Sequence, residues 1–414
     1  MSSFSFFFYT FRACERSTKQ AMGRLPVSEC SRMIRRGGIG DHTGLDYWHG
    51  MLPNEDTANL LKNSGQFLLR ALERNGANNI ILSVRWGKNI VNTVISKCAN
   101  GGYECQGTFF TSVKDIVDLY QVRKRQLNIN GVKVTLDMPV RRKRWELRHK
   151  MVKLEKELGS GSYGVVYRGT LTFPAKKPFV VAVKELTEMG VEASNALWKE
   201  ARVMQMYDHP NVVKMYGVAN DYMPYYLVME LVLGGSVDDY LAKKGSKVSV
   251  KARTQILYEA SVGLEYLHSK DCLHRDIACR NLLIDKVVKV TPIVADFGMT
   301  RHTTNYKIDP NKPMNLRWLA PEVYESAVVN KSTDVYAFGV TMYECFTQPY
   351  SIPYADWKAD KVYDKVVNNG YRLKPPDLMP RKIGDLMEEC IGPEESRPTF
   401  TVVAVCLKTF LRSS

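Results

Sequence analysis

The chain has 414 residues, of which 45% are hydrophobic and 24% are charged, a composition typical of a globular protein with roughly two or three domains. Lys and Arg total 58 against 43 Asp and Glu, so the net charge of +15 favours acidic partners such as phosphate groups. No apolar run approaches the roughly 20 residues of a membrane-spanning helix. The sequence has no Lys/Arg-rich stripe interleaved with aromatic residues, so we do not expect a nucleic acid partner. The nine cysteines include no C-x-x-C pair, which disfavours structural zinc or a disulfide framework and fits reduced thiols in the cytoplasm.

Residues 1–42 lack hydrophobic periodicity, and we expect them to form a disordered N-terminal tail. Residues 43–138 predict a small α+β domain in which antiparallel strands lie between two helices. The first helix is expected over residues 54–62. Three strands, joined by turns that contain Asn or Gly, are expected over residues 67–70, 80–86 and 91–96.

The second helix of this domain should begin after Ser112, which has the spacing of a capping box to Asp115. Four positions then form one apolar face of that helix: Val113, Ile116, Val117 and Tyr120. Residues 139–151 follow as a basic linker that contains the run RRKR. Such a run could serve nuclear import or lipid binding, but we favour a solvated linker, because short basic runs are common at domain edges.

Residues 152–412 change pattern and predict a second domain with two parts. Its first part should contain strands over residues 153–158, 165–170 and 179–186, followed by a helix over residues 196–206. Beyond Ser236 the chain is mostly helical, and the helix expected over residues 251–269 has a continuous apolar face. The pattern therefore predicts a sheet-rich lobe followed by a helical lobe.

A glycine-rich loop opens this second domain. The segment GSGSYG at residues 159–164 has the G-x-G-x-x-G spacing, which lets the backbone approach phosphate groups closely. The same spacing occurs in dinucleotide-binding turns, but those turns open a helix, whereas Val165 and Val166 continue as a strand. Lys184, in the segment VAVK, would bring positive charge to the α- and β-phosphates of a nucleotide. Glu200 is placed on the following helix to pair with Lys184.

Three further motifs follow in order. The segment HRDIACRN at residues 274–281 matches H-R-D-x-x-x-x-N, in which Asp276 can accept a hydroxyl proton and Asn281 can hold a magnesium ion. Asp296 begins a D-F-G motif, and its carboxylate is a suitable oxygen ligand for Mg²⁺. An A-P-E motif at residues 320–322 marks the end of the segment that begins at the D-F-G motif. Five motifs in this order and spacing predict an active kinase fold.

These motifs resemble the protein kinase superfamily over residues 152–412, and the resemblance implies a bilobal domain with a β-rich N-lobe and an α-helical C-lobe that uses ATP and Mg²⁺. The catalytic residues that it implies are Asp276, Lys184, Arg280 and Asn281, with metal ligands at Asn281 and Asp296. The nucleotide-binding residues that it implies are Gly159, Ser160, Gly161, Gly164, Val166, Ala182, Lys184, Glu200, Met229, Glu230, Val232 and Leu283. Structural roles follow by the same resemblance for Asp334 and for a pair between Arg397 and Glu322.

Residues near the catalytic motif favour tyrosine as the acceptor. Serine/threonine kinases usually have Lys two residues after the catalytic Asp, whereas this chain has Ala278 there and Arg280 four residues after, which resembles the tyrosine kinase form A-x-R-N. A tyrosyl oxygen lies further from its backbone than a seryl oxygen, so the peptide must lie further from the catalytic Asp. The segment LRW at residues 316–318 resembles the tyrosine kinase docking platform, although Asn315 replaces the Pro that usually precedes it.

Tyr306 stands where tyrosine kinases carry an activating phosphorylation site, between the D-F-G and A-P-E motifs. The resemblance makes Arg275, beside the catalytic Asp, the expected partner of that phosphate. A surface tyrosine with no regulatory role is the alternative.

The first domain also carries motifs. The segments YWHG at residues 47–50 and GQFLLR at residues 65–70 resemble the opening and the F-L-V-R core of SH2 domains, which implies that Arg70 binds a phosphotyrosyl phosphate through two hydrogen bonds. Where this resemblance leads us to expect Arg, Ser and His, the chain has Asn54, Leu72 and Thr93. We therefore expect weak phosphotyrosine binding that depends on Arg70. A structural module that does not bind phosphate is the alternative.

The chain places an SH2-like domain directly before a tyrosine kinase-like domain, and it contains the motif W-H-G-x-x-P and the sequence D-F-G-M. Together these three features resemble the Fes/Fer family of non-receptor tyrosine kinases. The resemblance implies a cytoplasmic enzyme, peripheral to the plasma membrane through its partners, that phosphorylates protein tyrosines and binds phosphotyrosine-containing proteins. One alternative is a serine/threonine or dual-specificity kinase, which the A-x-R-N form disfavours. The other alternative is a catalytically weak signalling scaffold, which the complete set of catalytic motifs disfavours.

Overall fold

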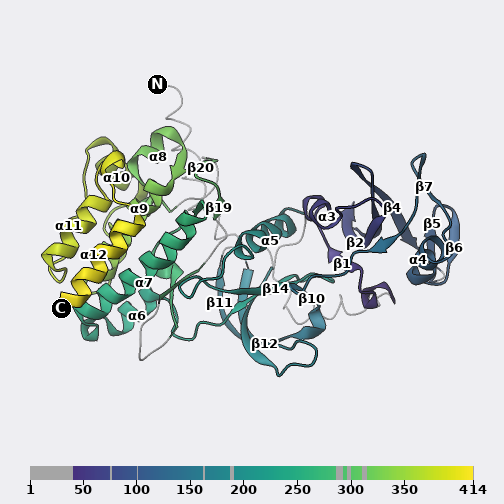
Figure 1. Cartoon of the computed structure of the whole chain (residues 1–414). Helices are drawn as coiled ribbons and strands as arrows, with labels where there is room; N and C mark the ends of the chain where they lie inside the picture. The colour runs from purple at the N-terminus through teal and green to yellow at the C-terminus, as the bar shows by residue number, and fades with distance from the viewer. Residues whose placement is uncertain are drawn as a thin grey trace. The chain divides into compact units, whose positions relative to one another are not determined.

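The computed structural model describes residues 41–74, 77–99, 101–161, 164–186, 191–285, 292–295, 300–309 and 315–413. These residues form two compact units, whose elements are labelled in Figure 1. The sheet unit contains the described residues from 41 to 201 together with residues 215–231, and the helical unit contains residues 202–214 and 232–413. Residues 1–40, which make up nearly all of the expected N-terminal tail, lie outside the described residues.

The first part of the sheet unit corresponds to the predicted small domain. Its described residues form a seven-stranded sheet of order β1-β2-β3-β4-β5-β6, in which β9 also pairs with β2. The strands are β1 (Trp48–Met51), β2 (Gln66–Arg74), β3 (Ala77–Trp86), β4 (Asn89–Lys97), β5 (Tyr103–Cys105), β6 (Thr108–Phe110) and β9 (Met138–Pro139). The accompanying elements are α3 (Asn54–Leu60), α4 (Val113–Gln121) and a hairpin of β7 (Leu127–Ile129) and β8 (Val132–Val134).

Local sequence accounts for these elements. The hydroxyl of Ser112 accepts a hydrogen bond from the backbone nitrogen of Asp115 at 3.1 Å, so the predicted cap of α4 is confirmed. Helix α4 then buries the four predicted apolar side chains. Strand β2 lies inside the sheet, where Phe67 and Leu69 are buried together with one charged side chain, Arg70.

The second part of the sheet unit is a six-stranded sheet of order β10-β14-β15-β13-β12-β11. Its strands are β10 (Glu146–Leu147), β11 (Val152–Gly161), β12 (Gly164–Leu171), β13 (Phe179–Glu185), β14 (Met215–Ala219) and β15 (Tyr226–Glu230), and α5 (Val191–Met204) follows β13 in the chain. The three predicted strands and the following helix are confirmed. A fully buried apolar cluster holds this sheet together: Leu147, Leu171, Val181, Val183, Ala219 and Val228.

The basic segment of residues 139–151 is exposed at Arg141, Lys143 and Arg144, as a solvated linker would be, but Arg142 and β10 depart from that expectation. Arg142 is 7% exposed, forms an ion pair with Asp221, and donates from Nη1 to the carbonyl oxygen of Leu147 at 2.8 Å. Strand β10, within the same segment, pairs with β14. A buried guanidinium is tolerated here because a carboxylate and backbone carbonyls accept its hydrogen bonds, which a count of basic residues cannot reveal.

The helical unit contains most of the described α-helices. These are α6 (Val237–Lys244), α7 (Val250–Ser269), α8 (Pro321–Ser326), α9 (Lys331–Phe346), α10 (Ala359–Tyr363), α11 (Arg381–Cys390) and α12 (Phe400–Ser413). Its short strands are β16 (Cys272–Leu273), β17 (Leu282–Ile284), β18 (Pro292–Val294), β19 (Arg301–His302), β20 (Asn305–Lys307) and β21 (Val328–Asn330). Helix α7 packs against α9 and α12, and Figure 1 shows α7 and α12 running side by side. No described helix has both the length and the apolar character needed to cross a membrane.

Candidate functional site

A lysine–glutamate ion pair lies in the sheet unit. Lys184 on β13 donates from Nζ to both carboxylate oxygens of Glu200 on α5, at 3.0 and 2.8 Å, as the sequence predicted. The side chains are 13% and 8% exposed, so the pair is largely shielded from water and from screening by salt. Glu200 thereby holds the ammonium group of Lys184 in a fixed position on the sheet.

The glycine-rich segment forms the hairpin between β11 and β12. Gly164 has a φ of +139°, and a Cβ atom at this position would lie 2.1 Å from the carbonyl oxygen of Glu185. Only glycine fits this contact, because the approach is too close for any side chain. Val166 pairs with Lys184 across β12 and β13, and Ala182 pairs with Met229 on β15, just before Glu230. Ser162 and Tyr163 lie outside the described residues.

In the helical unit, the carboxylate of Asp276 is held by its own loop. Asn281 donates from Nδ2 to Oδ2 of Asp276 at 2.8 Å and to its backbone oxygen at 2.7 Å. Arg280 forms an ion pair with Oδ1 of the same carboxylate. The guanidinium carbon of Arg280 lies 4.5 Å from the ring centroid of Trp318, a cation–π contact that fixes the arginine in turn. Asp296 of the D-F-G motif lies outside the described residues.

Asp334, at the start of α9, anchors the loop that carries Asp276. Its carboxylate accepts hydrogen bonds from the backbone nitrogens of His274 and Arg275, at 2.8 and 2.9 Å, and from Nε2 of His268 at 3.0 Å. Burial alone would raise the pKa of Asp334, but the hydrogen bond and charge of His268 outweigh it and hold that pKa below its usual value. The anchor also maintains the left-handed backbone of Arg275, whose φ is +71°.

Tyr306, on β20, lies against two arginines. Its ring centroid is 4.2 Å from the guanidinium carbon of Arg275 and 5.2 Å from that of Arg301. Burial, together with the neighbouring charge of Arg301, lowers the pKa of Arg275 to about 10, so the side chain is still a cation at neutral pH. Arg275, the expected partner of a phosphate on Tyr306, thus lies against the unmodified ring, and Arg301 is a second cation that the sequence analysis did not single out.

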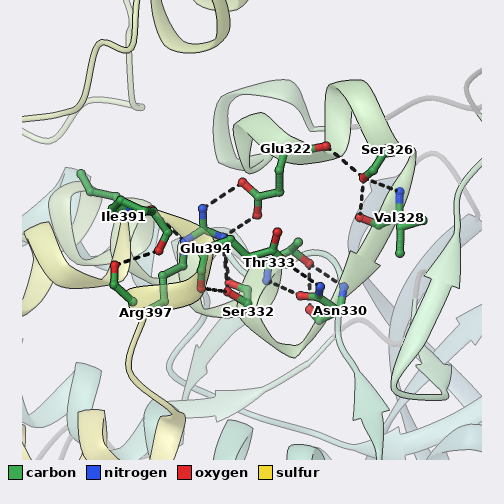
Figure 2. A network of polar contacts seen from close by, with 12 residues as sticks. Glu322, Ser326, Val328, Asn330, Ser332, Thr333, Ile391, Glu394 and Arg397 are labelled. Carbon is green, nitrogen blue, oxygen red and sulfur yellow. Dashed lines mark hydrogen bonds and ion pairs between the residues drawn. The ribbon is translucent and has the colours of Figure 1, made fainter.

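A bidentate ion pair ties the A-P-E motif to a later segment. Arg397 donates from Nη1 and Nη2 to Oε1 and Oε2 of Glu322, at 2.5 and 2.9 Å, and Figure 2 shows both contacts. Arg397 also donates from Nε to the carbonyl oxygen of Gly392 at 2.9 Å. Asn330 caps α9 in the same network by accepting from the backbone nitrogen of Thr333. The pair that the resemblance implied is confirmed, and it fixes the start of α8.

Arg70 lies almost fully buried in the first domain, with 1% of its surface exposed. Nε donates to the hydroxyl of Ser83 at 2.9 Å, and Nη1 donates to the carbonyl oxygen of Leu52 at 2.8 Å. Nη2 donates to the side-chain oxygens of Asn54 and Asn92, at 2.7 and 3.3 Å. These four acceptors are all neutral, and burial lowers the pKa of Arg70 to about 10.

Comparison with known proteins agrees with this geometry. Residues 152–407 match the protein tyrosine and serine/threonine kinase family, and residues 47–120 match the SH2 domain. The chain is 30% identical over 381 residues to Fer-related kinase 1 of Caenorhabditis elegans and covers 95% of that protein. The chain belongs to the Fps/Fer family of protein tyrosine kinases.

Two further relatives are longer than this chain. Tyrosine-protein kinase Fer of Homo sapiens is 31% identical over 393 residues, which are 93% of this chain but 46% of that protein. The transforming protein Fps of avian sarcoma virus (strain PRCII) is 32% identical over 362 residues, which are 86% of this chain and 66% of the viral protein. The chain thus spans less than two thirds of the length of both proteins.

Besides Arg301, two further residues were not assigned to a site from the sequence. The fourth-strand side chain that reaches Arg70 is Asn92 and not Thr93, because Asn92 pairs with Ser83 in the register of β3 and β4. Successive strand residues face opposite sides, so Thr93 lies on the face of β4 opposite to Asn92. The other residue is Asn315, whose Nδ2 donates to Oδ1 of Asp276 at 2.5 Å. The alternation along β4 could have revealed Asn92, whereas no sequence signal predicts the contact of Asn315.

Proposed function

We propose that this chain transfers the γ-phosphate of ATP to tyrosine hydroxyls of proteins, and that its SH2 domain directs it to phosphotyrosine-containing proteins. The observation that carries the proposal is the carboxylate of Asp276, which Arg280 and Asn281 hold in the A-x-R-N form of the catalytic loop. A scaffold without catalytic activity would have no need for this arrangement.

The residues of the sheet unit fit a nucleotide. The backbone of Gly159 has open space where a Cβ atom would stand, with no atom within 4 Å, so a phosphate can approach it. Lys184 would hold the α- and β-phosphates, because its ammonium group is oriented by Glu200 and remains able to donate to phosphate oxygens. Ala182 and Met229, paired on neighbouring strands, together with Val166, would contact the base and sugar.

The residues of the helical unit fit a magnesium ion. The amide nitrogen of Asn281 is engaged with Asp276, which leaves its side-chain oxygen as a hard ligand of the kind that Mg²⁺ prefers. Asp296 would supply a carboxylate ligand, and Val232 and Leu283 would complete the nucleotide contacts. When bound, Mg²⁺ neutralises charge on the phosphates and so makes the γ-phosphorus accessible to an oxygen nucleophile.

The chain's own residues then position the acceptor. Asp276 would accept the hydrogen bond of the tyrosine hydroxyl and orient its oxygen for transfer. Arg280 is held over Trp318 while it contacts Asp276, so the platform that would support the substrate peptide and the catalytic carboxylate are fixed to each other. Ala278 and Arg280 give the loop the A-x-R-N form in place of the Lys usual in serine/threonine kinases, which favours tyrosine over serine.

The SH2 domain would bind phosphotyrosine through Arg70. A phosphate dianion is a stronger acceptor than the four neutral oxygens that now surround this guanidinium, so exchange of Asn54 or Asn92 for phosphate is favourable. We also propose a cytoplasmic location, because the described cysteines are free thiols, as expected in a reducing compartment.

A phosphotransfer assay on a mixed library of tyrosine and serine peptides tests the proposed function. The full chain should label tyrosine peptides, and Asp276→Asn or Lys184→Met should lower the rate by about 10² or more, because each variant removes positioning or charge stabilisation. Asp276→Asn should keep the wild-type melting temperature, whereas Lys184→Met should stay folded at the assay temperature but melt lower, because it leaves the buried carboxylate of Glu200 without its cation. Near-wild-type turnover by Asp276→Asn would show that the role assigned to this residue is wrong. Labelling of serine peptides alone would refute the assignment of tyrosine as the phosphate acceptor.

A further inference from the structure

The side chain of Asn315 reaches the catalytic carboxylate from a distant segment. Its Nδ2 lies 2.5 Å from Oδ1 of Asp276, although the two residues are 39 positions apart in the chain. An ionised carboxylate has no hydrogen to donate, so the amide nitrogen of Asn315, and not its oxygen, must face Asp276. The contact is a charge-assisted hydrogen bond, which is stronger than one between neutral groups.

Asn315 belongs to a closed cycle of contacts around Asp276. Its backbone oxygen accepts from the backbone nitrogen of Trp318 at 3.0 Å, in the short 3₁₀ turn Leu316–Trp318. The ring of Trp318 lies under the guanidinium of Arg280, and Arg280 pairs with Asp276. Asp276, Asn315, Trp318 and Arg280 therefore restrain one another, and Asn315 is the member that closes the cycle.

The donors around Asp276 differ in rigidity. Oδ1 receives Arg280 and Asn315, and Oδ2 receives Asn281. The side chain of Arg280 is long and 31% exposed, so by itself it restrains rotation of the carboxylate weakly. The short side chain of Asn315 adds a second donor on the same oxygen, which keeps the second acceptor site of Oδ2 open for a hydroxyl group.

We propose that Asn315 is a positioning residue for phosphoryl transfer, and this inference rests on the proposed role of Asp276. Asn315 acts by fixing the carboxylate of Asp276 in the orientation that accepts the substrate hydroxyl. The φ of Asn315 is −83°, which is close to the value that proline requires, so the Pro usual in tyrosine kinases would fit the backbone here but would carry no donor. The amide hydrogen bond is therefore what asparagine adds at this position.

Steady-state kinetics of the full chain and its variants, with Mg-ATP and a tyrosine peptide, test this role. Asn315→Ala should lower kcat about ten- to a hundredfold, as expected for one lost hydrogen bond to a charged group, with an unchanged KM for ATP. Asn315→Asp is isosteric but replaces the donor by a second carboxylate, so its kcat should be at least as low. Asn315→His keeps a nitrogen donor the same number of bonds from the backbone and should recover most of the lost rate.

Two controls separate the possible outcomes. Asn368→Asp makes the same chemical change at an exposed amide that contacts Asp364, and its kcat should equal that of the wild type. All Asn315 variants should keep the wild-type melting temperature, because the side chain is exposed. If Asp276→Asn is inactive while Asn315→Ala and Asn315→Asp retain wild-type kcat, the positioning role is refuted and the proposed function stands. Loss of activity in Asn315→His equal to that in Asn315→Ala would also refute the hydrogen-bond mechanism.

Discussion

At the scale of single residues, Arg70 combines an unusual degree of burial with a set of neutral partners. A buried guanidinium without a carboxylate nearby is costly, because four neutral hydrogen bonds replace water only partly. An incoming phosphate group would supply the missing negative charge. Phosphate binding would, however, break the hydrogen bonds that the two asparagines now accept from Arg70. The free energy needed to break them would weaken the net binding of phosphate.

We therefore predict weak phosphotyrosine binding that depends on Arg70. In a titration of phosphotyrosyl peptides against the full chain, Arg70→Leu should weaken binding at least about tenfold, since a hydrogen bond to a charged group contributes about 1.5–3 kcal/mol. The control Arg123→Leu, an exposed arginine just beyond α4, should bind as the wild type does. Equal affinity of wild type and Arg70→Leu for every peptide would instead identify a purely structural module.

At the scale of elements, the antiparallel pair of β20 and β21 holds Tyr306 against Arg275 and Arg301. Both cations lie in contact with the unmodified ring. A phosphate on Tyr306 would carry about −1.5 to −2 charges and would form charge-assisted hydrogen bonds to them. Because Arg275 adjoins Asp276, the restraint of this strand pair would be transmitted directly to the loop that carries Asp276.

We predict that the chain phosphorylates itself on Tyr306 and that the modification raises its activity. Mass spectrometry after incubation with ATP should find phosphate on Tyr306, and Tyr306→Phe should abolish the rise in rate that preincubation with ATP produces. Tyr371→Phe, a change at an exposed tyrosine of the same unit, should have no effect on that rise. Full activity together with phosphate elsewhere and none on Tyr306 would contradict the prediction.

Strand β1 owes its position to Gly50. This residue has a φ of +62°, and a Cβ atom here would lie 2.2 Å from the carbonyl oxygen of Asn220, which also accepts from the backbone nitrogen of Met51 at 2.9 Å. A side chain at Gly50 would therefore meet backbone atoms, which cannot move aside as a flexible side chain can.

We predict that Gly50→Ala lowers the free energy of unfolding by about 2–4 kcal/mol, since it adds a steric clash to the cost of a left-handed conformation. Gly87→Ala is the matched control, because Gly87 has a similar φ of +57° but no atom within 4 Å of the added Cβ. That variant should lose only about 1–2 kcal/mol. Denaturant titration of both proteins measures the difference, and equal losses would mean that the close approach to Asn220 is unimportant.

At the scale of the whole molecule, the SH2 domain and the six-stranded sheet belong to one compact unit. Buried polar contacts join them: Asn220 donates from Nδ2 to the carbonyl oxygens of His49 and Met51, at 2.8 and 2.7 Å. Trp198 on α5 donates from Nε1 to the same oxygen of Met51 at 3.1 Å. Because groups buried in this way must keep their partners, we expect the two sheets to unfold together.

Asp221 provides a pH-dependent test of this junction. Burial would raise its pKa, but the hydrogen bond from His149 and the charge of Arg142 outweigh it and lower that pKa below the usual value. A depressed pKa stabilises the fold at a pH above the unfolded value of about 3.9, and this stabilisation is lost as the pH falls through the folded value.

We predict that Asp221→Asn lowers the free energy of unfolding by about 3 kcal/mol at pH 7, because Arg142 is left buried without an acidic partner. The difference between wild type and variant should shrink as the pH falls below about 4. Asp46→Asn, which removes the exposed pair with Arg141, should leave stability unchanged at every pH. A pH-independent difference for Asp221→Asn would show that the ion pair is not its cause.

The sequence by itself determined the order of the elements and most residues of the candidate active site. Helix α4 could be predicted because its cap and apolar face are encoded within ten consecutive residues, from Ser112 to Gln121. The pairing of Lys184 with Glu200 could be predicted because both residues belong to motifs whose chemistry requires them at that spacing. Short-range patterns of this kind depend on local geometry, which is the same wherever the segment occurs.

Only the tertiary structure decided which distant side chains meet. The register of β3 with β4 turns Asn92, and not Thr93, toward Arg70, and a shift of one residue would have reversed them. Arg142 is a basic residue in a basic run, yet packing of β10 against β14 buries it beside Asp221. Asn315 reaches Asp276 only because the fold brings two segments together, and no local propensity encodes such a contact.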